Sequence, residues 1–238
     1  MMRHGKRFVA NLEKVDRTRF YTHQEAVPLL KQTATAKFDE SAEAVFRLSI
    51  DVKKNEHRIR GTVTLPHGTG KSVRVLVIAK GEKVKEAETA GADFVGGDDL
   101  IKKIEGGWLD FDKMVATPDM MATVSKLGRV LGPRGLMPSP KSGTVTADVS
   151  QAVKELKQGK LEFRVDDYGQ IHTAFGRASF DEKRLIENFL ALATAIFDEK
   201  PSDVKGRFLK SVTLSSTMGP GIKLDPEQVT KAVTEGRL

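Results

Sequence analysis

The 238-residue chain contains no cysteine. This absence excludes disulfides, thiolate nucleophiles and sulfur-ligated metals, and it is typical of a protein of the reducing cytosol. Long apolar runs are also missing, because no stretch approaches the roughly 20 residues of a membrane span. The basic start of the chain lacks the apolar segment of a secretory signal. We therefore expect a cytoplasmic protein with no membrane partner.

Side chains that could carry out catalysis are few and scattered. The acid pairs Asp98-Asp99 and Asp166-Asp167 fall at an expected helix start and an expected turn, where capping and turn chemistry explain them. No serine stands in a sharp glycine-flanked nucleophile turn. The histidines lack the spacing of a metal site; they are His4, His23, His57, His67 and His172. We expect no enzyme, no metal and no cofactor.

One segment leaves a catalytic alternative open. Gly70-Lys71-Ser72 looks like the end of a phosphate-binding loop. That motif requires a glycine where Leu65 stands, and a helix rather than a strand should follow at Val73. A nucleotide-dependent enzyme that uses Gly68 to Ser72 stays the alternative function, and a DNA-binding regulator is a third possibility.

Positive charge is abundant and is concentrated in one unusual stretch. Lys and Arg outnumber Asp and Glu by 39 to 32, and the net charge of +7 favours a phosphate-bearing partner. From Lys126 to Val145 the chain has four glycines, three prolines and no acid, which predicts an irregular loop. Its bases either face an anionic partner or are merely solvated; they are Lys126, Arg129, Arg134 and Lys141.

Hydrophobic periodicity near both ends of the chain predicts strands and helices of an antiparallel unit. Val45–Asp51 and Ile59–Leu65 are expected strands that follow each other closely, so we expect them to pair antiparallel. Leu161–Val165 and Gln170–Ala174 predict a hairpin. Two helices are expected to open with capping boxes, at Thr22 with Glu25 and at Ser179 with Glu182.

The middle of the chain has a different pattern. Val73–Ala79 is almost wholly apolar, as in a strand covered on both faces, and helices and strands then alternate up to a helix at Val149–Gln158. We predict an α/β protein of two domains. Domain I, residues 1–67 and 160–238, is a discontinuous α+β sandwich from both termini; domain II, residues 68–159, is an inserted Rossmann-like three-layer domain. The crossings, at His67, Gly68 and Gly159, are expected to form a hinge.

Two short stretches have side chains suited to RNA. Lys37-Phe38 places a base beside an aromatic ring, which can pair a phosphate and stack on a nucleobase, although Phe38 could equally cap the core. Ser215 to Gly219 combines small hydroxyls with a flexible methionine and a glycine that permits close backbone approach.

Several stretches together resemble the bacterial ribosomal protein L-one family, the protein of the lateral stalk of the large ribosomal subunit. The resemblance covers almost the whole chain. The matching stretches are Lys6-Arg7, Thr35-Ala36-Lys37-Phe38-Asp39-Glu40, Arg60 to Val63, Leu65 to Gly68, Gly91 to Gly97, Asp110-Phe111-Asp112, Lys126 to Lys141 and Thr217 to Pro220.

The resemblance implies a structural constituent of the large subunit that binds the stalk region of 23S rRNA. It further implies that the protein helps exit-site tRNA to leave and represses translation by binding its own-operon mRNA. The free protein is expected to be a cytoplasmic monomer that associates with ribosomes and does not bind DNA.

By the same resemblance, the main RNA-binding residues lie on domain I. They are Lys37, Phe38, Glu40 or Ser41 nearby, Ser211, Thr217, Met218 and Gly219. Secondary RNA contacts are expected at Lys6, Arg7, Lys126, Arg129, Arg134 and Lys141. The turn at Asp166-Asp167-Tyr168 is expected near that surface, but two acids are unfavourable toward phosphate.

Overall fold

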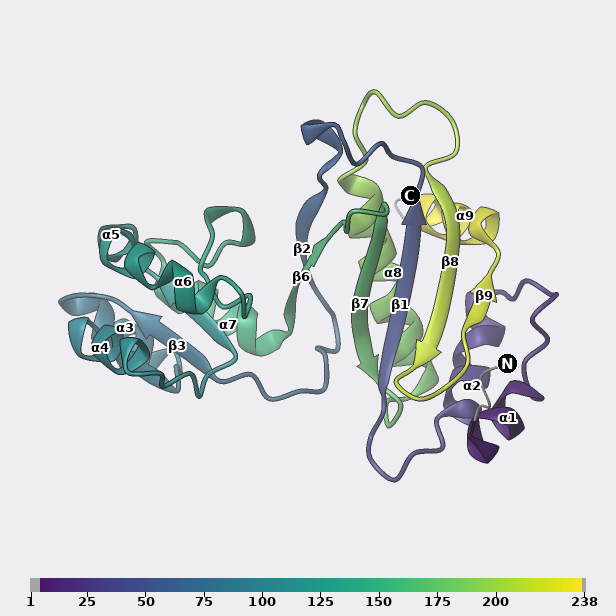
Figure 1. The fold of residues 1–238 in the computed structure, drawn as a ribbon, viewed down its shortest axis with the longest axis horizontal. Coiled ribbons are helices and arrows are strands. Elements are labelled where there is room, and N and C mark those ends of the chain that lie inside the picture. The colour runs from purple at the N-terminus through teal and green to yellow at the C-terminus, as the bar shows by residue number, and fades with distance from the viewer. Residues whose placement is uncertain (1–4, 237–238) are drawn as a thin grey trace. The chain divides into compact units, whose positions relative to one another are not determined.

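The computed structural model describes residues 5–236 (Figure 1), so His4 and the outermost ends of the expected domain I lie outside the described residues. The chain forms two compact units. Unit 1 contains the described residues up to Gly70 and from Leu161 onward, and unit 2 is Lys71–Lys160. The sequence places the crossings near residues 67 and 159, close to these boundaries.

Unit 1 is built on an antiparallel sheet in the order β7-β1-β8-β9. Buried and partly buried residues alternate along the two central strands, so one face of the sheet meets the core and the other does not. The strands are β1 (Ser41–Leu48), β7 (Gln170–Arg177), β8 (Leu209–Ser216) and β9 (Ile222–Leu224).

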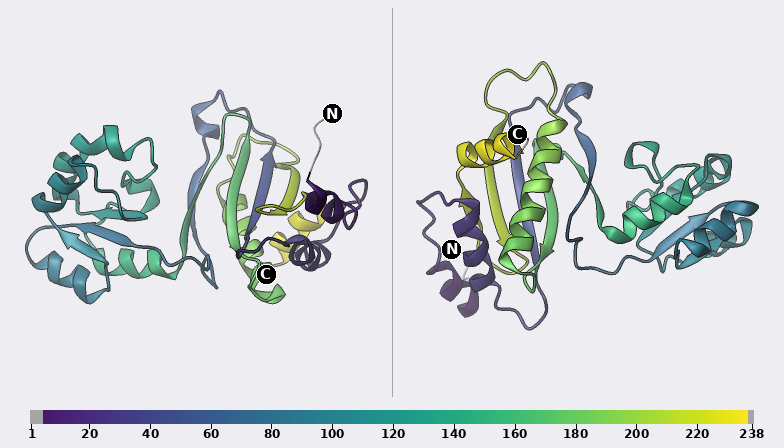
Figure 2. Two further views of the ribbon diagram at one scale, coloured as in Figure 1. Left: turned by 60° about the horizontal axis from the view of Figure 1, so that its bottom comes forward. Right: turned by 180° about the vertical axis from the view of Figure 1, so that it is seen from behind.

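Helices cover the core face of this sheet (Figure 2). Phe189 of α8 (Glu182–Asp198) stacks on Phe46 of β1 with ring centroids 5.8 Å apart and meets Phe175 of β7 edge to face. The opposite face, here called the open face, carries side chains that are at most partly buried, such as Glu43 and Arg47. The helices of unit 1 are α1 (Lys6–Leu12), α2 (His23–Thr33), α8 (Glu182–Asp198) and α9 (Pro226–Glu235).

The expected pairing of the first two strands is wrong. β1 pairs with β7 and β8, whereas β2 (Arg60–Thr64) pairs with β6 (Lys160–Arg164) in a separate two-stranded sheet. Residues 49–59 between β1 and β2 contain a 3₁₀ turn at Asn55–His57 rather than a tight hairpin connection. The apolar residues of β1 therefore find their partners on strands more than 120 residues away.

The expected hairpin around residues 161–174 is also incomplete. β6 and β7 are joined by one isolated bridge, between Val165 and Ile171, and each strand then continues in a different sheet. The turn forms as expected, with Gly169 at a φ of 75°. The connection is thus a corner between two sheets.

One of the two expected capping boxes forms. Thr22 accepts a hydrogen bond from Glu25 N, and Glu25 reciprocates at the N-terminus of α2. The box at Ser179 is wrong, because the N-cap of α8 is Asp181, two residues later, and Ser179 Oγ donates to Asp39 Oδ2 at 2.8 Å. The Asp39 carboxylate also accepts the hydrogen bond from Ser179 N that Glu182 would accept in a capping box.

Unit 2 has three layers, with the parallel sheet β4-β3-β5 in the middle. α3 and α7 pack on one face, and α4 with the helical turns of residues 118–131 packs on the other. The elements are β3 (Val75–Ile78), α3 (Glu82–Thr89), β4 (Phe94–Gly96), α4 (Asp98–Glu105), β5 (Lys113–Ala116) and α7 (Val149–Gln158).

The stretch from Lys126 to Val145 is less irregular than expected. Gly128 has helical backbone angles, and the buried Leu127 and Leu131 attach this part to the core of unit 2. Burial of these two leucines outweighs the low helix propensity of the glycines. The turns are 3₁₀ at Pro118–Met120, α5 (Met121–Val124), 3₁₀ at Ser125–Leu127, α6 (Gly128–Leu131) and 3₁₀ at Pro140–Ser142.

Candidate nucleic-acid interface

Lys37 and Phe38 lie exposed in the loop between α2 and β1. The Phe38 side chain is 56% exposed, so the alternative that it caps the core is wrong. An aromatic ring beside a lysine, both free of the core, can stack on a base while the lysine meets a phosphate.

A second loop, between β8 and β9, lies at the same end of the sheet (Figure 1) and contains Met218. Its side chain is 48% exposed. A Cβ at the neighbouring Gly219 would lie 2.5 Å from Ser216 Oγ, so the turn requires glycine there. The two loops thus each present one large apolar side chain to solvent.

Glu40 joins these loops from beneath. Its Oε2 accepts hydrogen bonds from Ser216 Oγ at 2.7 Å and Met218 N at 2.9 Å, and its Oε1 accepts one from Ala36 N at 2.7 Å. The residue is 1% exposed, so its carboxylate supports the loops and offers no atom to a ligand. Burial raises the pKa of Glu40, but the hydrogen bonds from Ser216, Met218 and Ala36 outweigh it and lower the pKa overall.

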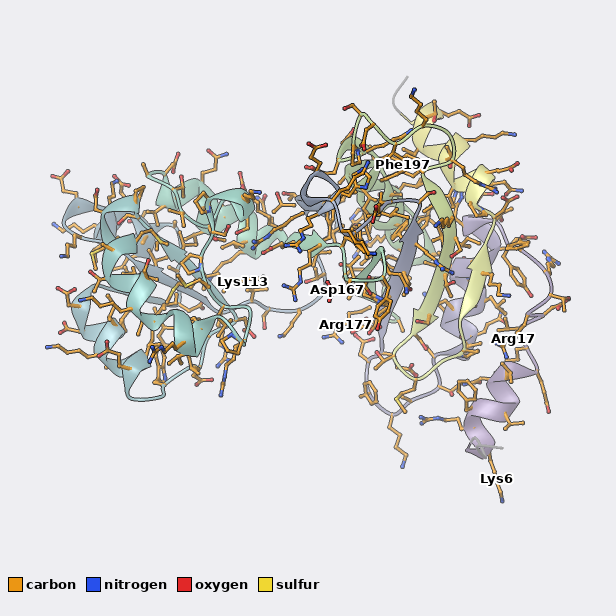
Figure 3. All side chains as sticks on the ribbon, turned by 45° about the horizontal axis from the view of Figure 1, so that its top comes forward. Lys6, Arg17, Lys113, Asp167, Arg177 and Phe197 are labelled. Atoms are coloured by element: carbon orange, nitrogen blue, oxygen red, sulfur yellow. The ribbon has the colours of Figure 1, made fainter. Side chains whose placement is uncertain are left out.

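Ser41 and Thr217 continue the pairing of β1 and β8 into the loops. Ser41 N donates to Thr217 Oγ1 at 2.9 Å, and Thr217 N donates to Ser41 O at 3.2 Å. Arg177 of β7 (Figure 3) donates to Ser41 Oγ and to Asp39 O. Sequence reasoning missed Arg177, because only the pairing of Ser41 with Arg177 brings it to the loops.

Ser211 lies on the open face, away from the two loops. It is opposite Arg47 in the register of β1 and β8. Seven residues of chain separate it from Met218, which in an extended strand is about 23 Å. Ser211 therefore extends the surface along the sheet, and the exposed Arg47 beside it is a second residue that the sequence analysis did not single out.

In the turn at Asp166-Asp167-Tyr168, one of the two carboxylates accepts hydrogen bonds from the backbone of the turn itself. Asp166 Oδ1 accepts from Tyr168 N at 2.9 Å and from Gln170 N at 2.8 Å. Burial raises the pKa of Asp166, but these backbone hydrogen bonds and His172 lower it overall. Tyr168 is almost wholly exposed, and Asp167 is exposed beside it.

The residues expected to make secondary contacts are divided between the two units. Lys6 and Arg7 are exposed on α1 of unit 1. The four that belong to unit 2 are exposed on its helical turns and the loop that follows; they are Lys126, Arg129, Arg134 and Lys141.

The expected hinge residues have defined local roles. Asn188 of α8 is fully buried, accepts from His67 N at 3.0 Å and donates to Gly68 O at 2.9 Å. The first crossing is thereby held to unit 1 as far as Gly68. Gly159 caps α7 with a φ of 103°.

The segment Gly68 to Ser72 does not form a phosphate-binding loop. Lys71 Nζ donates a hydrogen bond to Asp112 Oδ1 at 3.1 Å, and the next element is the strand β3. A Cβ at Gly70 would meet Arg177 and Phe180 at 2.7 to 2.9 Å, so side chains fill the space beside it. The geometry gives the nucleotide-dependent alternative no support.

Within residues 5–236, no group of three or more His, Asp or Glu side chains could hold a metal ion. No helix in this part of the chain is long and apolar enough to cross a bilayer.

Comparison with known proteins gives consistent matches. Residues 30–220 match the family described as "Ribosomal protein L1p/L10e family". "Large ribosomal subunit protein uL1" of Macrococcus caseolyticus is 56% identical over 229 residues, which cover 96% of this chain and 99% of that protein. The protein of the same name from Thermobifida fusca is 54% identical over 231 residues, covering 97% and 98%.

Proposed function

This chain belongs to the ribosomal protein L1p/L10e family, and we propose that it is a non-catalytic constituent of the large ribosomal subunit that binds ribosomal RNA through unit 1. The observation that carries the proposal is the pair of loops joined by Glu40, which present Phe38 and Met218 to solvent. We call these two loops, residues 34–40 and 217–219, the paired loops.

The chemistry of the paired loops suits structured RNA better than duplex DNA. Phe38 and Met218 offer apolar surface to unstacked bases, and Lys37 offers a charge to a phosphate. The exposed Thr217 adds a hydroxyl that can meet a ribose 2′-OH. A-form RNA displays such hydroxyls, and DNA lacks them.

In its finer form, the proposal is that the paired loops and Ser211 bind the stalk region of 23S rRNA. The same surface binds the protein's own-operon mRNA and thereby represses its translation, so the two RNAs exclude each other. The ribosome-bound protein also assists the release of exit-site tRNA. Outside the ribosome it is a cytoplasmic monomer.

The bases of unit 2 contribute in a different way. Lys126, Arg129, Arg134 and Lys141 are exposed on unit 2, whereas the large exposed apolar side chains belong to unit 1. We assign them secondary phosphate contacts, which add affinity at low salt without reading sequence.

Substitutions of the exposed apolar residues test the proposal. Phe38→Ala or Met218→Ala should weaken binding of a stalk-rRNA fragment by about 5- to 150-fold at fixed salt, because a stacked base contributes about 1–3 kcal/mol. Phe20→Ala is the matched control, since Phe20 is 59% exposed on the same unit but outside the paired loops. Equal losses for Phe20 and Phe38 would overturn the assignment.

A second comparison separates the two units. Thr217→Val, which removes the acceptor of Ser41 N, should weaken binding more than any single change of a base in unit 2. A change such as Lys141→Gln should instead lower the salt slope of binding by about one phosphate contact. If both sets of variants lose affinity equally, the paired loops are not the main surface.

Competition tests the regulatory part. The stalk fragment should displace the operon mRNA leader, and Met218→Ala should weaken both complexes by a similar factor. Independent binding of the two RNAs would refute repression through this surface while leaving rRNA binding intact.

A further inference from the structure

Helix α1 is attached to unit 1 in an unusual way. Asn11 is the one buried residue of this helix, at 3% exposure, while Val9 is 42% exposed. A surface helix is normally held by an apolar stripe. Here the fully buried residue is a polar amide, and the apolar Phe8 and Leu12 are partly buried.

The Asn11 amide joins α1 to the start of the first of the paired loops. Its Nδ2 donates to Thr33 O and to Thr35 Oγ1, both at 2.8 Å. Lys14, just beyond the helix, donates to Gln32 O at 3.3 Å. These polar contacts end two residues before Lys37.

The charges on α1 are not explained by helix stability. Lys6 and Arg7 occupy its first turn, where the helix dipole disfavours cations, and that turn contains no acid. Lys6 points into solvent (Figure 3). Burial raises the pKa of Glu40, and the charge of Arg7 adds to three hydrogen bonds in lowering it overall.

We propose that Asn11 is a positioning residue whose amide docks the basic helix α1 beside the paired loops, so that Lys6 and Arg7 reach phosphates of the RNA bound there. This inference rests on the proposed RNA binding. Bound RNA should in turn strengthen the docking of α1, by linkage between the two equilibria.

A salt series with a double-mutant cycle tests the role of Asn11. Three variants are compared with the unaltered protein: Asn11→Ala, Lys6→Gln with Arg7→Gln, and the combination of all three changes. Loss of two phosphate contacts should reduce the slope of log K against log salt by about 1.4 to 1.8. Asn11→Ala should reproduce most of this reduction although it removes no charge, and the combined variant should lose little more.

Two controls make the result specific. Lys231→Gln, on α9, removes an exposed charge from the helical side of unit 1 and should leave the slope unchanged. Amide exchange in the RNA-free protein should be faster for Val9 and Glu13 in Asn11→Ala, because their hydrogen bonds to Gly5 O and Val9 O belong to α1. Bound RNA should slow this exchange in the unaltered protein.

The outcomes separate the two proposals. A fall in affinity with an unchanged slope, or full additivity of the changes, would show that Asn11 acts only on stability and would overturn the inference. If the unaltered protein does not bind stalk RNA, the proposed function fails. Unchanged amide exchange in Asn11→Ala would overturn the docking by itself.

Discussion

At the scale of single residues, Glu40 is the side chain on which the geometry of the paired loops depends. A buried carboxylate is costly unless donors compensate its charge. Ala36, Ser216 and Met218 provide donors from both loops, so the charge that is expensive to bury is also the group that holds the loops together.

Replacing this carboxylate by an amide should weaken both folding and RNA binding. In Glu40→Gln, one amide hydrogen must face a backbone N–H or the Ser216 hydroxyl, and the loss of a charge-assisted bond costs about 1–3 kcal/mol. Urea unfolding at pH 7 measures this loss. RNA affinity should fall while the salt slope stays unchanged, because Glu40 contacts no phosphate.

The pH dependence of stability provides a second readout for Glu40. Its pKa in the folded protein lies below the ordinary value of 4.5, so its stabilising contribution is complete above that pH and is lost as pH falls through the folded pKa. The stability difference between the unaltered protein and Glu40→Gln should therefore narrow below about pH 4.5. Glu43→Gln, on the open face of the same strand, is the control, with a change within about 0.5 kcal/mol. A difference independent of pH would contradict this role.

At the scale of elements, two glycines of unit 2 differ in whether their backbone conformation requires a glycine. Gly159 ends α7 in the left-handed region, with a φ of 103°. Gly128 lies in α6, in the right-handed helical region, and a Cβ there would meet no atom within 4 Å. Only the first position needs a glycine for conformational reasons.

Alanine at these two positions should have opposite effects. Gly159→Ala should destabilise unit 2 by about 1–2 kcal/mol, the cost of a left-handed conformation for a residue with a Cβ. Gly128→Ala should stabilise it by about 0.4–1 kcal/mol by restricting the unfolded chain. The single tryptophan, Trp108, packs against Phe94 and Phe111, so its fluorescence in urea reports unit 2. Effects of the same sign would contradict the assignment of the Gly159 conformation.

At the scale of the whole molecule, the two units have separate hydrophobic cores. One cluster of buried residues lies wholly in unit 1, and two clusters on the faces of the parallel sheet lie in unit 2. The chain crosses between the units near Gly70 and near Leu161. Stability changes in one core should therefore affect the other unit little.

A pair of core substitutions tests this independence. Asn188→Ala removes hydrogen bonds to His67, Gly68 and Phe175 and should cost unit 1 about 2–4 kcal/mol, while the Trp108 transition stays in place. Leu131→Ala, in the core of unit 2, should move the Trp108 transition by about 2–5 kcal/mol. Loss of RNA binding reports the unfolding of unit 1, and far-UV circular dichroism reports both units. If both variants move both transitions equally, the chain unfolds as one cooperative body.

Local features of the fold could be read from the sequence wherever nearby residues decide them. The bounds of α7 agree with the prediction, because this helix has its start and its glycine stop within its own segment. The capping box at Thr22 formed for the same reason. The one at Ser179 did not, because Asp39, 140 residues away, took its hydrogen bonds.

The residues of the candidate site likewise divide into those that the sequence indicated and those that only the structure revealed. Residue chemistry and family resemblance drew attention to Lys37-Phe38 and to Thr217-Met218-Gly219, each a short stretch with its own signal. Arg177, Arg47 and Asn11 have no such signal, because a lone arginine or asparagine in a strand or helix has no distinguishing neighbours. Their places follow from strand register and helix docking.

The sequence by itself determined the family, the basic balance, the α/β alternation of the middle segment and the residue types of both paired loops. Only the tertiary structure decided that Glu40 lies beneath these loops, that β1 pairs with β7 and β8, and that the stretch from Lys126 belongs to the core of unit 2. The physical reason is that periodicity and capping act over a few residues. Pairing and burial are decided by which distant surfaces exclude water together.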